Sequence, residues 1–406
     1  MTRLANARLA DGRRVDVGIG EGRIASIDPA GAASSAGAPT IDLEGALLVP
    51  DFVDGHVHLD KTLLGLPFQS HRPGDSIAER IARERELRRE LRSPVGERAK
   101  RLIDQIVPLG TTALRSHVDI DLEVGLSGLH ALLRVRETTR AVDIQLVAFP
   151  QSGIMVSPGV ADLLDAAIGE GADLVGGLDP AGIDNDVEGH LGVIFGIAER
   201  RGVGLDIHLH DPGPLGCWEL RQIAARTLAA GLVGRVAVSH AFALGAVDDG
   251  EFGSTAEALA RADVAIMTNG PGPVPMPPVR RLVAAGVRVF AGSDNIRDAW
   301  SPLGDGDMLA RAMLIAYRQD FRTDAGLELA FDLTTRASAG VLGLEDHGIR
   351  VGAIADLVAM PSGSIAEAVA ARPRRSLVMK RGRVVARDGV LGEREGELEL
   401  RYHGIR

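Results

Sequence analysis

The sequence predicts an α/β protein with a (β/α)8 barrel in the middle of the chain and a small β-domain made from its two ends. Strand-like and helix-like segments alternate along the middle of the chain, and eight strands are the number that closes such a barrel. Both ends carry only short strand patterns. Histidines and carboxylates follow the strand-like segments, and barrels of this class build their sites at the carboxyl ends of their strands.

The two ends of the chain supply short strands that need one another. Strands are predicted over Arg3–Leu9, Arg14–Ile19, Arg23–Ile27, Asp356–Met360, Leu377–Lys380 and Arg383–Ala386, and Gly31–Pro39 reads as a loop of small residues. Isolated hairpins are marginal in water. We therefore expect residues 1–49 and 348–406 to form one domain, rather than two independent additions to a barrel of residues 50–347.

Eight strands and eight helices are predicted between the ends. The strands are Leu47–Val53, Thr112–Asp119, Gln145–Pro150, Asp173–Leu178, Gly204–His208, Arg235–Ser239, Val264–Thr268 and Arg288–Gly292. The helices are Ile77–Arg92, Gly96–Val107, Leu122–Glu137, Gly159–Ile168, Val187–Arg200, Glu219–Ala229, Thr255–Arg261 and Pro277–Ala285. An open doubly wound sheet is the alternative, but no glycine-rich phosphate-binding fingerprint follows the first strand. The charged stretch Ile77–Arg92 is interpreted as a solvated helix or a subunit contact.

The composition narrows the class of protein. Hydrophobic residues make up 45% of the 406 and charged residues 25%, which fits a globular protein and argues against disorder. The net charge of −10 disfavours nucleic acid and anionic membranes as partners. No signal-peptide pattern and no apolar run of transmembrane length is found. The single cysteine, Cys217, excludes an internal disulfide, and we expect a cytoplasmic protein.

Polar residues able to hold a metal ion follow the predicted barrel strands. Alternate side chains of a strand share one face, so His56 and His58 point the same way. Later strands end at His117, His208, His210, His240 and Asp294. Three imidazoles and one carboxylate suit a divalent ion that activates water for hydrolysis. A nearby histidine or carboxylate then moves protons to the leaving group.

These residues resemble the signature of the amidohydrolase superfamily. The resemblance is stronger to the branch that contains bacterial cytosine deaminase and N-isopropylammelide aminohydrolase, and it runs from about residue 45 to about residue 360. The similar segments are Phe52–Asp60, Arg115–Val118, Val147–Gln151, Gly171–Val175, Asp206–His208, Val238–His240, Gly292–Asn295 and Trp300–Gly304. The resemblance implies a distorted (β/α)8 (TIM) barrel with a β-sandwich made from both chain ends. It also implies hydrolytic removal of an amine from a small nitrogen heterocycle, such as a pyrimidine or triazine.

The resemblance assigns roles to individual residues. The metal ligands would be His56, His58, His208 and Asp294. His240 would hydrogen-bond the attacking water and polarise the scissile centre, and Gln151 would bind the amide edge of the substrate. The strand that carries a metal-bridging lysine in two-metal relatives ends here in Leu178-Asp179-Pro180. We therefore expect one divalent ion, Zn or Fe.

Two positions depart from cytosine deaminase. Asp211 stands where that enzyme has a glutamate as proton shuttle, and Asn295 stands where it has a second aspartate. Asp211 remains a candidate acid–base group, and Lys61, His210 and Asn295 are similar to the N-isopropylammelide branch. Lys61, His210 and Asn295 are candidates for substrate binding, and Lys61 and Asp294 are also candidates for catalysis.

Three functions are compatible with this set of residues. The first is a mononuclear aminohydrolase, for which we also expect a homo-oligomer. The second is a cyclic amide hydrolase that opens a C–N bond of a ring, since the acid pair of the deaminase is incomplete. The third, ranked last, is a barrel that binds a ligand without turning it over. His71, His130, His190, His347 and His403 are interpreted as surface or structural residues, and His117 and Asp119 as supports of the site.

Overall fold

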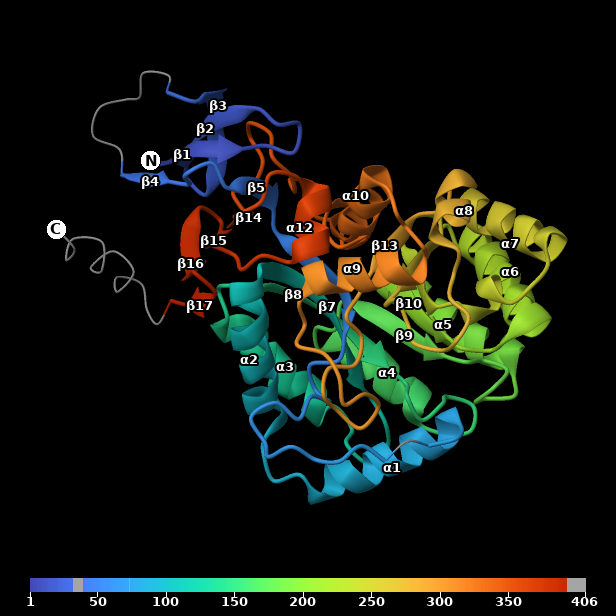
Figure 1. Ribbon diagram of the computed structural model, residues 1–406. Helices are drawn as coiled ribbons and strands as arrows, with labels where there is room; N and C mark the ends of the chain where they lie inside the picture. The colour runs from blue at the N-terminus through green and yellow to red at the C-terminus, as the bar shows by residue number, and fades with distance from the viewer. Residues whose placement is uncertain (32–38, 73, 393–406) are drawn as a thin grey trace.

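The computed structural model describes residues 1–31, 39–72 and 74–392 and shows a barrel with a sheet at one side (Figure 1). Eight strands hydrogen-bond in chain order, each parallel to the next. They are β6 (Phe52–Val57), β7 (Thr111–Asp119), β8 (Asp143–Phe149), β9 (Leu174–Leu178), β10 (Gly204–Leu209), β11 (Val236–His240), β12 (Ala265–Thr268) and β13 (Val289–Ala291). The predicted barrel is confirmed.

The predicted loop over Gly31–Pro39 falls mostly outside the described residues, and His403 lies outside them.

The barrel closes where the residues after β13 meet β6. The Asp294 backbone N–H donates to the His56 carbonyl at 2.8 Å, and a parallel bridge joins Val57 to Asp294. Gly292 passes so close to β6 that a Cβ on it would lie 2.5 Å from the His56 Cβ. Only glycine allows this approach. The seam of the barrel thereby brings two predicted metal-ligand positions side by side.

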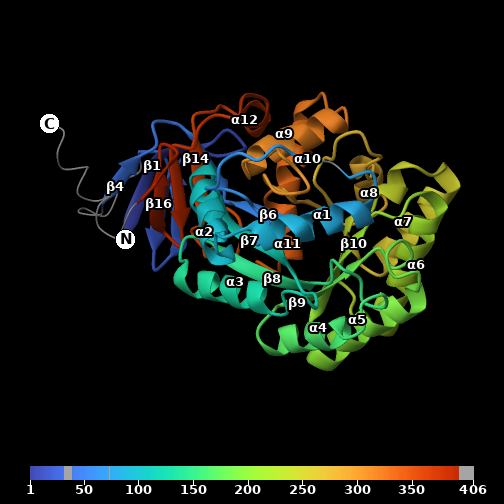
Figure 2. The same ribbon diagram turned by 90° about the horizontal axis from the view of Figure 1, so that it is seen from below.

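Helices surround the barrel, as two views at right angles show (Figures 1 and 2). The eight predicted helices correspond to α1 (Ile77–Glu90), α2 (Val95–Ile106), α3 (Ser127–Thr138), α4 (Val160–Gly169), α5 (Val187–Arg201), α6 (Gly213–Ala229), α7 (Asp249–Arg261) and α8 (Val279–Ala284). Three further helices that we did not predict follow β13: α9 (Met308–Arg318), α10 (Asp324–Leu333) and α11 (Arg336–Val341). In Figure 2, α1 crosses in front of the barrel strands.

Both ends of the chain join in one mixed sheet of nine strands. Its order is β17-β16-β15-β14-β5-β1-β2-β3, with β4 paired to β1. The strands are β1 (Thr2–Arg8), β2 (Arg14–Gly20), β3 (Arg23–Pro29), β4 (Thr40–Asp42), β5 (Leu47–Pro50), β14 (Leu357–Met360), β15 (Leu377–Lys380), β16 (Arg383–Arg387) and β17 (Val390–Leu391); the short helix α12 (Ile365–Ala371) lies between β14 and β15. The expected pairing of the two ends is therefore present.

One predicted strand is wrong in its extent. Leu47–Val53 is not a single barrel strand, because β5 pairs with β14 in the end sheet and the barrel begins at Phe52. The Asp51 N–H donates to the Asp356 carbonyl of the end sheet, and the next N–H, of Phe52, donates to the Gly110 carbonyl of the barrel. Residue 51 is thus where the chain changes sheets. The apolar sequence runs through this point without a turn signal.

The apolar residues form two main cores, and the larger one also includes Leu47, Val49 and Val358 from one face of the end sheet. The larger core packs the barrel strands against their helices. A second core joins strands from both chain ends, with Leu4, Val17, Leu48, Leu357 and Met379 among its buried members. Among the described residues, no helix combines the length and the apolar character that a membrane crossing needs.

Candidate active site

The four predicted ligands meet at the carboxyl end of the barrel. Nε2 of His56 and Nε2 of His58 each lie 3.5 Å from Oδ1 of Asp294. The ring of His208, from β10, has its centroid 4.6 Å from that of His56. All three histidines are buried, since at most 3% of their surface is exposed. The strand alternation of β6 and the closure of the barrel produce this cluster.

Buried nitrogen atoms without partners show that this cluster suits a metal ion. Nε2 of His56 and both ring nitrogens of His208 are buried and have no hydrogen-bond partner among the described residues. Buried polar atoms are almost always paired, so such a group points to a ligand that it can hold. Burial lowers the pKa of His58 to about 3, with a smaller contribution from Lys61, and so leaves its imidazole neutral. A neutral imidazole is the form that binds metal.

His117 lies closer to this cluster than the sequence indicated. Its ring centroid is 4.1 Å from that of His56 and 4.6 Å from that of His208. Within the part of the chain that the structure describes, neither of its ring nitrogens has a hydrogen-bond partner. The nitrogens of His56, His117 and His208 lie within 4.8 Å of one another, as do the ligand atoms of His56, His58 and Asp294. His117 therefore offers a further nitrogen that could hold a metal ion together with His56 and His208.

Hydrogen bonds from a surrounding layer orient the predicted ligands. Ser239 Oγ lies 2.9 Å from Nδ1 of His56 and donates to Asp206 Oδ1 at 3.0 Å. The Asn269 side-chain amide donates to Oδ2 of Asp294 at 2.7 Å. With Oδ2 held in this way, Oδ1 of Asp294 faces the two histidines of β6. Such partners fix ligand orientation and usually affect metal affinity.

His240 and His210 lie as a stacked pair beside the cluster. Their ring centroids are 4.4 Å apart, and the ring of His240 is 5.1 Å from that of His208. Burial disfavours protonation of His210, but the Asp179 carboxylate 2.9 Å from its Nδ1 outweighs burial and raises the pKa of His210. His240 has its pKa lowered well below the usual range, first by burial and then by His210. His210 is therefore more readily protonated than His240.

Asp211 lies beside a second carboxyl group, that of Glu219. Its Oδ2 accepts from the Gly182 N–H at 2.9 Å, while Oε1 of Glu219 accepts from the neighbouring Ala181 N–H at 2.9 Å. Glu219 is fully buried. Burial raises the pKa of both carboxyls, and that of Glu219 reaches about 8, with Asp211 as the next cause. Sequence reasoning missed Glu219, which lies in the middle of α6.

Lys61 and Gln151 belong to a buried network that includes helix α1. The Lys61 ammonium lies 3.1 Å from Asp119 Oδ1 and 3.4 Å from Glu84 Oε2, and it donates to the side-chain oxygen of Gln151. Glu84 also accepts from the side chains of Gln151 and Trp300. The interpretation of the Ile77–Arg92 stretch as only solvated or as a subunit contact was wrong for this residue. Glu84 is 6% exposed and faces the site.

Asn295 is anchored in the loop after β13. Its side-chain amide donates to Oδ2 of Asp298 at 2.7 Å, and the other oxygen of Asp298 accepts from the backbone of Trp300 at 2.8 Å. Burial raises the pKa of Asp298 to about 7. These bonds fix the position of Asn295 next to Asp294.

The site residues described above all lie in a stretch that matches a known protein family. The amidohydrolase family matches residues 39–386, which is most of the chain and contains all the site residues described above. The chain belongs to the amidohydrolase family. The resemblance expected from the sequence is confirmed.

This amidohydrolase has relatives along nearly its whole length. It is 33% identical over 357 residues to the N-isopropylammelide isopropyl amidohydrolase of Pseudomonas sp. (strain ADP), covering 86% of this chain and 89% of that one. The crystal structure of N-isopropylammelide isopropylaminohydrolase from Burkholderia multivorans ATCC 17616 superposes with a TM-score of 0.93 at 43% identity, covering 96% and 99% of the two chains. The 5-methylcytosine deaminase of Klebsiella pneumoniae, liganded with 5-fluorocytosine, superposes with a TM-score of 0.86 at 27% identity, covering 97% and 99%.

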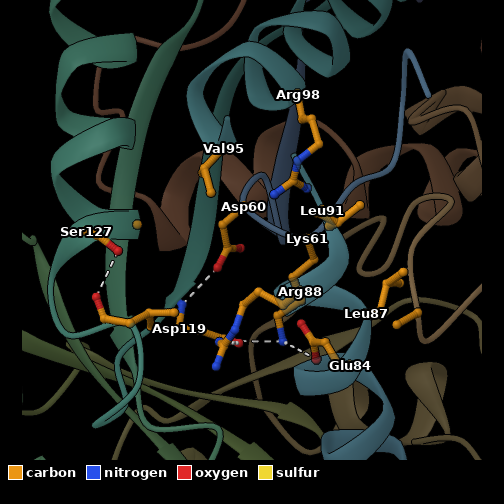
Figure 3. A pocket seen from close by; sticks show the side chains of 13 residues that line it. Asp60, Lys61, Glu84, Leu87, Arg88, Leu91, Val95, Arg98, Asp119 and Ser127 are labelled. Atoms are coloured by element: carbon orange, nitrogen blue, oxygen red, sulfur yellow. Dashed lines mark hydrogen bonds and ion pairs between the residues drawn. The ribbon is translucent and has the colours of Figure 1, made fainter. Parts of the chain in front are cut away.

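A cavity of about 100 Å³ adjoins the site of this amidohydrolase (Figure 3). It lies beside Lys61, Glu84 and Asp119 and is not lined by the predicted metal ligands. Arg88, on α1, contributes its guanidinium to the same wall and is 3.5 Å from Asp119. Figure 3 shows the Lys61 ammonium between the Glu84 and Asp119 carboxylates. The cavity is thus separated from the histidine cluster by the Lys61 network.

Proposed function

We propose that this amidohydrolase is a mononuclear, metal-dependent aminohydrolase that removes an amine from a small nitrogen heterocycle. The observation that carries the proposal is a pair of metal-competent triads that share His56, one with His58 and Asp294 and the other with His117 and His208, beside His240. Relatives at 33% and 43% identity bear the name of an N-isopropylammelide hydrolase. We propose a triazine of this kind, or else a pyrimidine, as the substrate.

The four ligands would hold one divalent ion, zinc or iron. An ion bound there supplies Lewis-acid activation of water. His56 and His58 reach it from β6, His208 from β10 and Asp294 from the barrel seam. The strand that carries a metal-bridging lysine in two-metal relatives is β9, which ends here in Leu178-Asp179-Pro180 without a lysine, and this supports a single metal.

His240 would accept a hydrogen bond from the attacking water and polarise the scissile centre. Its pKa is lowered by burial, so the ring is neutral near pH 7, and its buried Nδ1 has no hydrogen-bond partner in residues 1–31, 39–72 and 74–392. Asp211 would accept a proton from the attacking water and donate it to the leaving amine, because burial raises its pKa toward the range in which a carboxyl can do both. Lys61, Gln151, His210 and Asn295 would position the ring, and Lys61 would also stabilise negative charge on it.

The proposal is tested by metal analysis and amine release. The purified protein should contain about one zinc or iron per chain and release isopropylamine from N-isopropylammelide or ammonia from an aminopyrimidine. The variant Asp294→Asn should lose most of its metal and activity, while Asp162→Asn, a change on the outer helix α4, should behave as the wild type. Bound metal with no amine released from any ring tested would contradict the substrate class.

A cyclic amide hydrolase remains the second candidate. It is favoured by Asp211 and Asn295, which replace the acid pair of cytosine deaminase. Such an enzyme would open the ring of a lactam or cyclic imide without releasing an amine. Mass spectrometry of the products separates the two, because ring opening adds one water to the substrate and releases nothing. We also propose that the protein forms a homo-oligomer. We propose a cytoplasmic location, which is in keeping with the single, buried Cys217.

A further inference from the structure

Glu84 lies on a surface helix, and its side chain accepts hydrogen bonds from three loops of the site. Its Oε2 accepts from the Lys61 ammonium, the Gln151 side-chain amide and the Trp300 indole. These donors follow β6, β8 and β13, three strands that are far apart in the sequence. One carboxylate oxygen therefore ties helix α1 to three sides of the barrel mouth.

The chemistry of the two neighbours fixes which way the Gln151 amide points. Lys61 carries only donors, so the oxygen of Gln151 must face it. An ionised Glu84 carries only acceptors, so the nitrogen of Gln151 must face the carboxylate. The reverse orientation would place an NH2 group against an ammonium and an oxygen against a carboxylate. The pair Lys61 and Glu84 therefore allows only one orientation of this amide.

The same network immobilises Lys61. Its ammonium has three N–H groups, and three acceptors surround it: Asp119, Gln151 and Glu84. The rings of Phe149 and Trp300 lie 5.4 and 5.6 Å from its nitrogen. Phe149 in turn stacks on the ring of His208, with centroids 4.1 Å apart. The network thus continues without a gap to the predicted metal cluster.

We propose that Glu84 is a positioning residue for substrate recognition, which orients the Gln151 amide and holds the Lys61 ammonium in place. The inference rests on the proposed function. After the Gln151 amide has bonded to Lys61 and Glu84, one of its N–H groups and part of its oxygen remain available to a bound ring. An acceptor of the ring must then lie toward the amide nitrogen, and a donor toward the amide oxygen. Without the Glu84 charge, the amide can turn over and this order is lost.

The test compares Glu84→Gln with Glu86→Gln, which makes the same change at an exposed position of the same helix. Both are made with Trp218→Phe, since Trp218 and Trp300 are the only tryptophans of the chain. The emission of Trp300 should change in Glu84→Gln and stay unchanged in Glu86→Gln. Steady-state kinetics with N-isopropylammelide should show a KM about 10- to 100-fold higher, as expected for loss of hydrogen bonds to a charged group.

The kcat of Glu84→Gln should fall by less than the KM rises, because binding of the ring depends on Gln151 and only the charge of Lys61, which Asp119 still holds, acts on the chemical step. Glu84→Asp keeps the charge on a shorter side chain and should give an intermediate KM; it also serves as the test if Glu84→Gln does not fold. A folded Glu84→Gln protein with unchanged KM overturns the proposal, and so does a raised KM with unchanged Trp300 emission. A wild-type protein that hydrolyses none of the rings refutes the proposed function instead. Trp300 emission then still decides whether Glu84 makes these contacts.

Discussion

Substitution of Gly292 by alanine should damage the barrel seam and the metal site together. The new Cβ would lie 2.5, 2.6 and 2.7 Å from the Cβ, O and N atoms of His56. Ordinary contacts of a Cβ atom are about 1 Å longer. Backbone atoms cannot swing away as a side chain can, so β6 or the segment after β13 must move. A movement of that size breaks the 2.8 Å hydrogen bond from Asp294 to His56.

The expected cost follows from these contacts. Overpacking a core costs about 1–3 kcal/mol, and the lost hydrogen bond adds about 1 kcal/mol. We therefore expect Gly292→Ala to lower the free energy of unfolding of the metal-free protein by about 2–4 kcal/mol. Zinc affinity should also fall, since His56 and Asp294 move apart.

Urea unfolding and a zinc titration against a competing chelator measure the two effects. The matched control is Gly192→Ala on helix α5, where an added Cβ meets no atom within 4 Å. This control should be neutral or stabilising by about 0.5–1 kcal/mol, because alanine favours the helix. A Gly292→Ala protein as stable as the wild type, with unchanged zinc affinity, would refute the close approach at the seam.

Three further predictions concern metal, ligand orientation and pH. Removal of the metal with a chelator should lower the melting temperature by a few degrees, and added zinc or iron should restore it, as expected for a ligand that binds only the folded state; an unchanged melting temperature would argue against a bound ion. Asn269→Leu should weaken metal binding by about 10- to 100-fold, because Asp294 loses the bond to its Oδ2; calorimetry with an unchanged affinity would contradict this. The pKa of Glu219 is raised from 4.5 to about 8, first by burial, so the folded state keeps a proton that the unfolded state releases above about pH 4.5. The free energy of unfolding should therefore fall as the pH rises from about 4.5 to 8, and it should fall less in Glu219→Gln. Urea unfolding of both proteins across this pH range measures the difference. Parallel pH profiles would count against the buried carboxyl.

The parts of the site that the sequence could predict depend on local periodicity. His56 and His58 follow from strand alternation, and Asp294 and His208 from their places at strand ends. Such positions converge whenever a barrel closes in chain order. This is why the predicted ligands lie together in the structure although more than 230 residues separate His56 from Asp294.

The missed parts depend on contacts between distant segments. Helix α1 is rich in charged residues, so its pattern could not show that Glu84 is the one buried against Lys61 and Gln151. Glu219 is similarly hidden in the middle of α6, and its environment comes from the loop after β9. The split between β5 and β6 was missed for the same reason. Asp51 and Phe52 change sheets because of their partners, Asp356 and Gly110, and not because of any local turn.

The most direct test of this account is a crystal structure with anomalous scattering recorded at the zinc and iron edges. We predict one strong peak per chain, with Nε2 of His56, Nε2 of His58, a nitrogen of His208 and a carboxylate oxygen of Asp294 all at about 2.0–2.3 Å. A peak bound by other residues, two peaks at this site, or no peak in protein that is active on its substrate would contradict it.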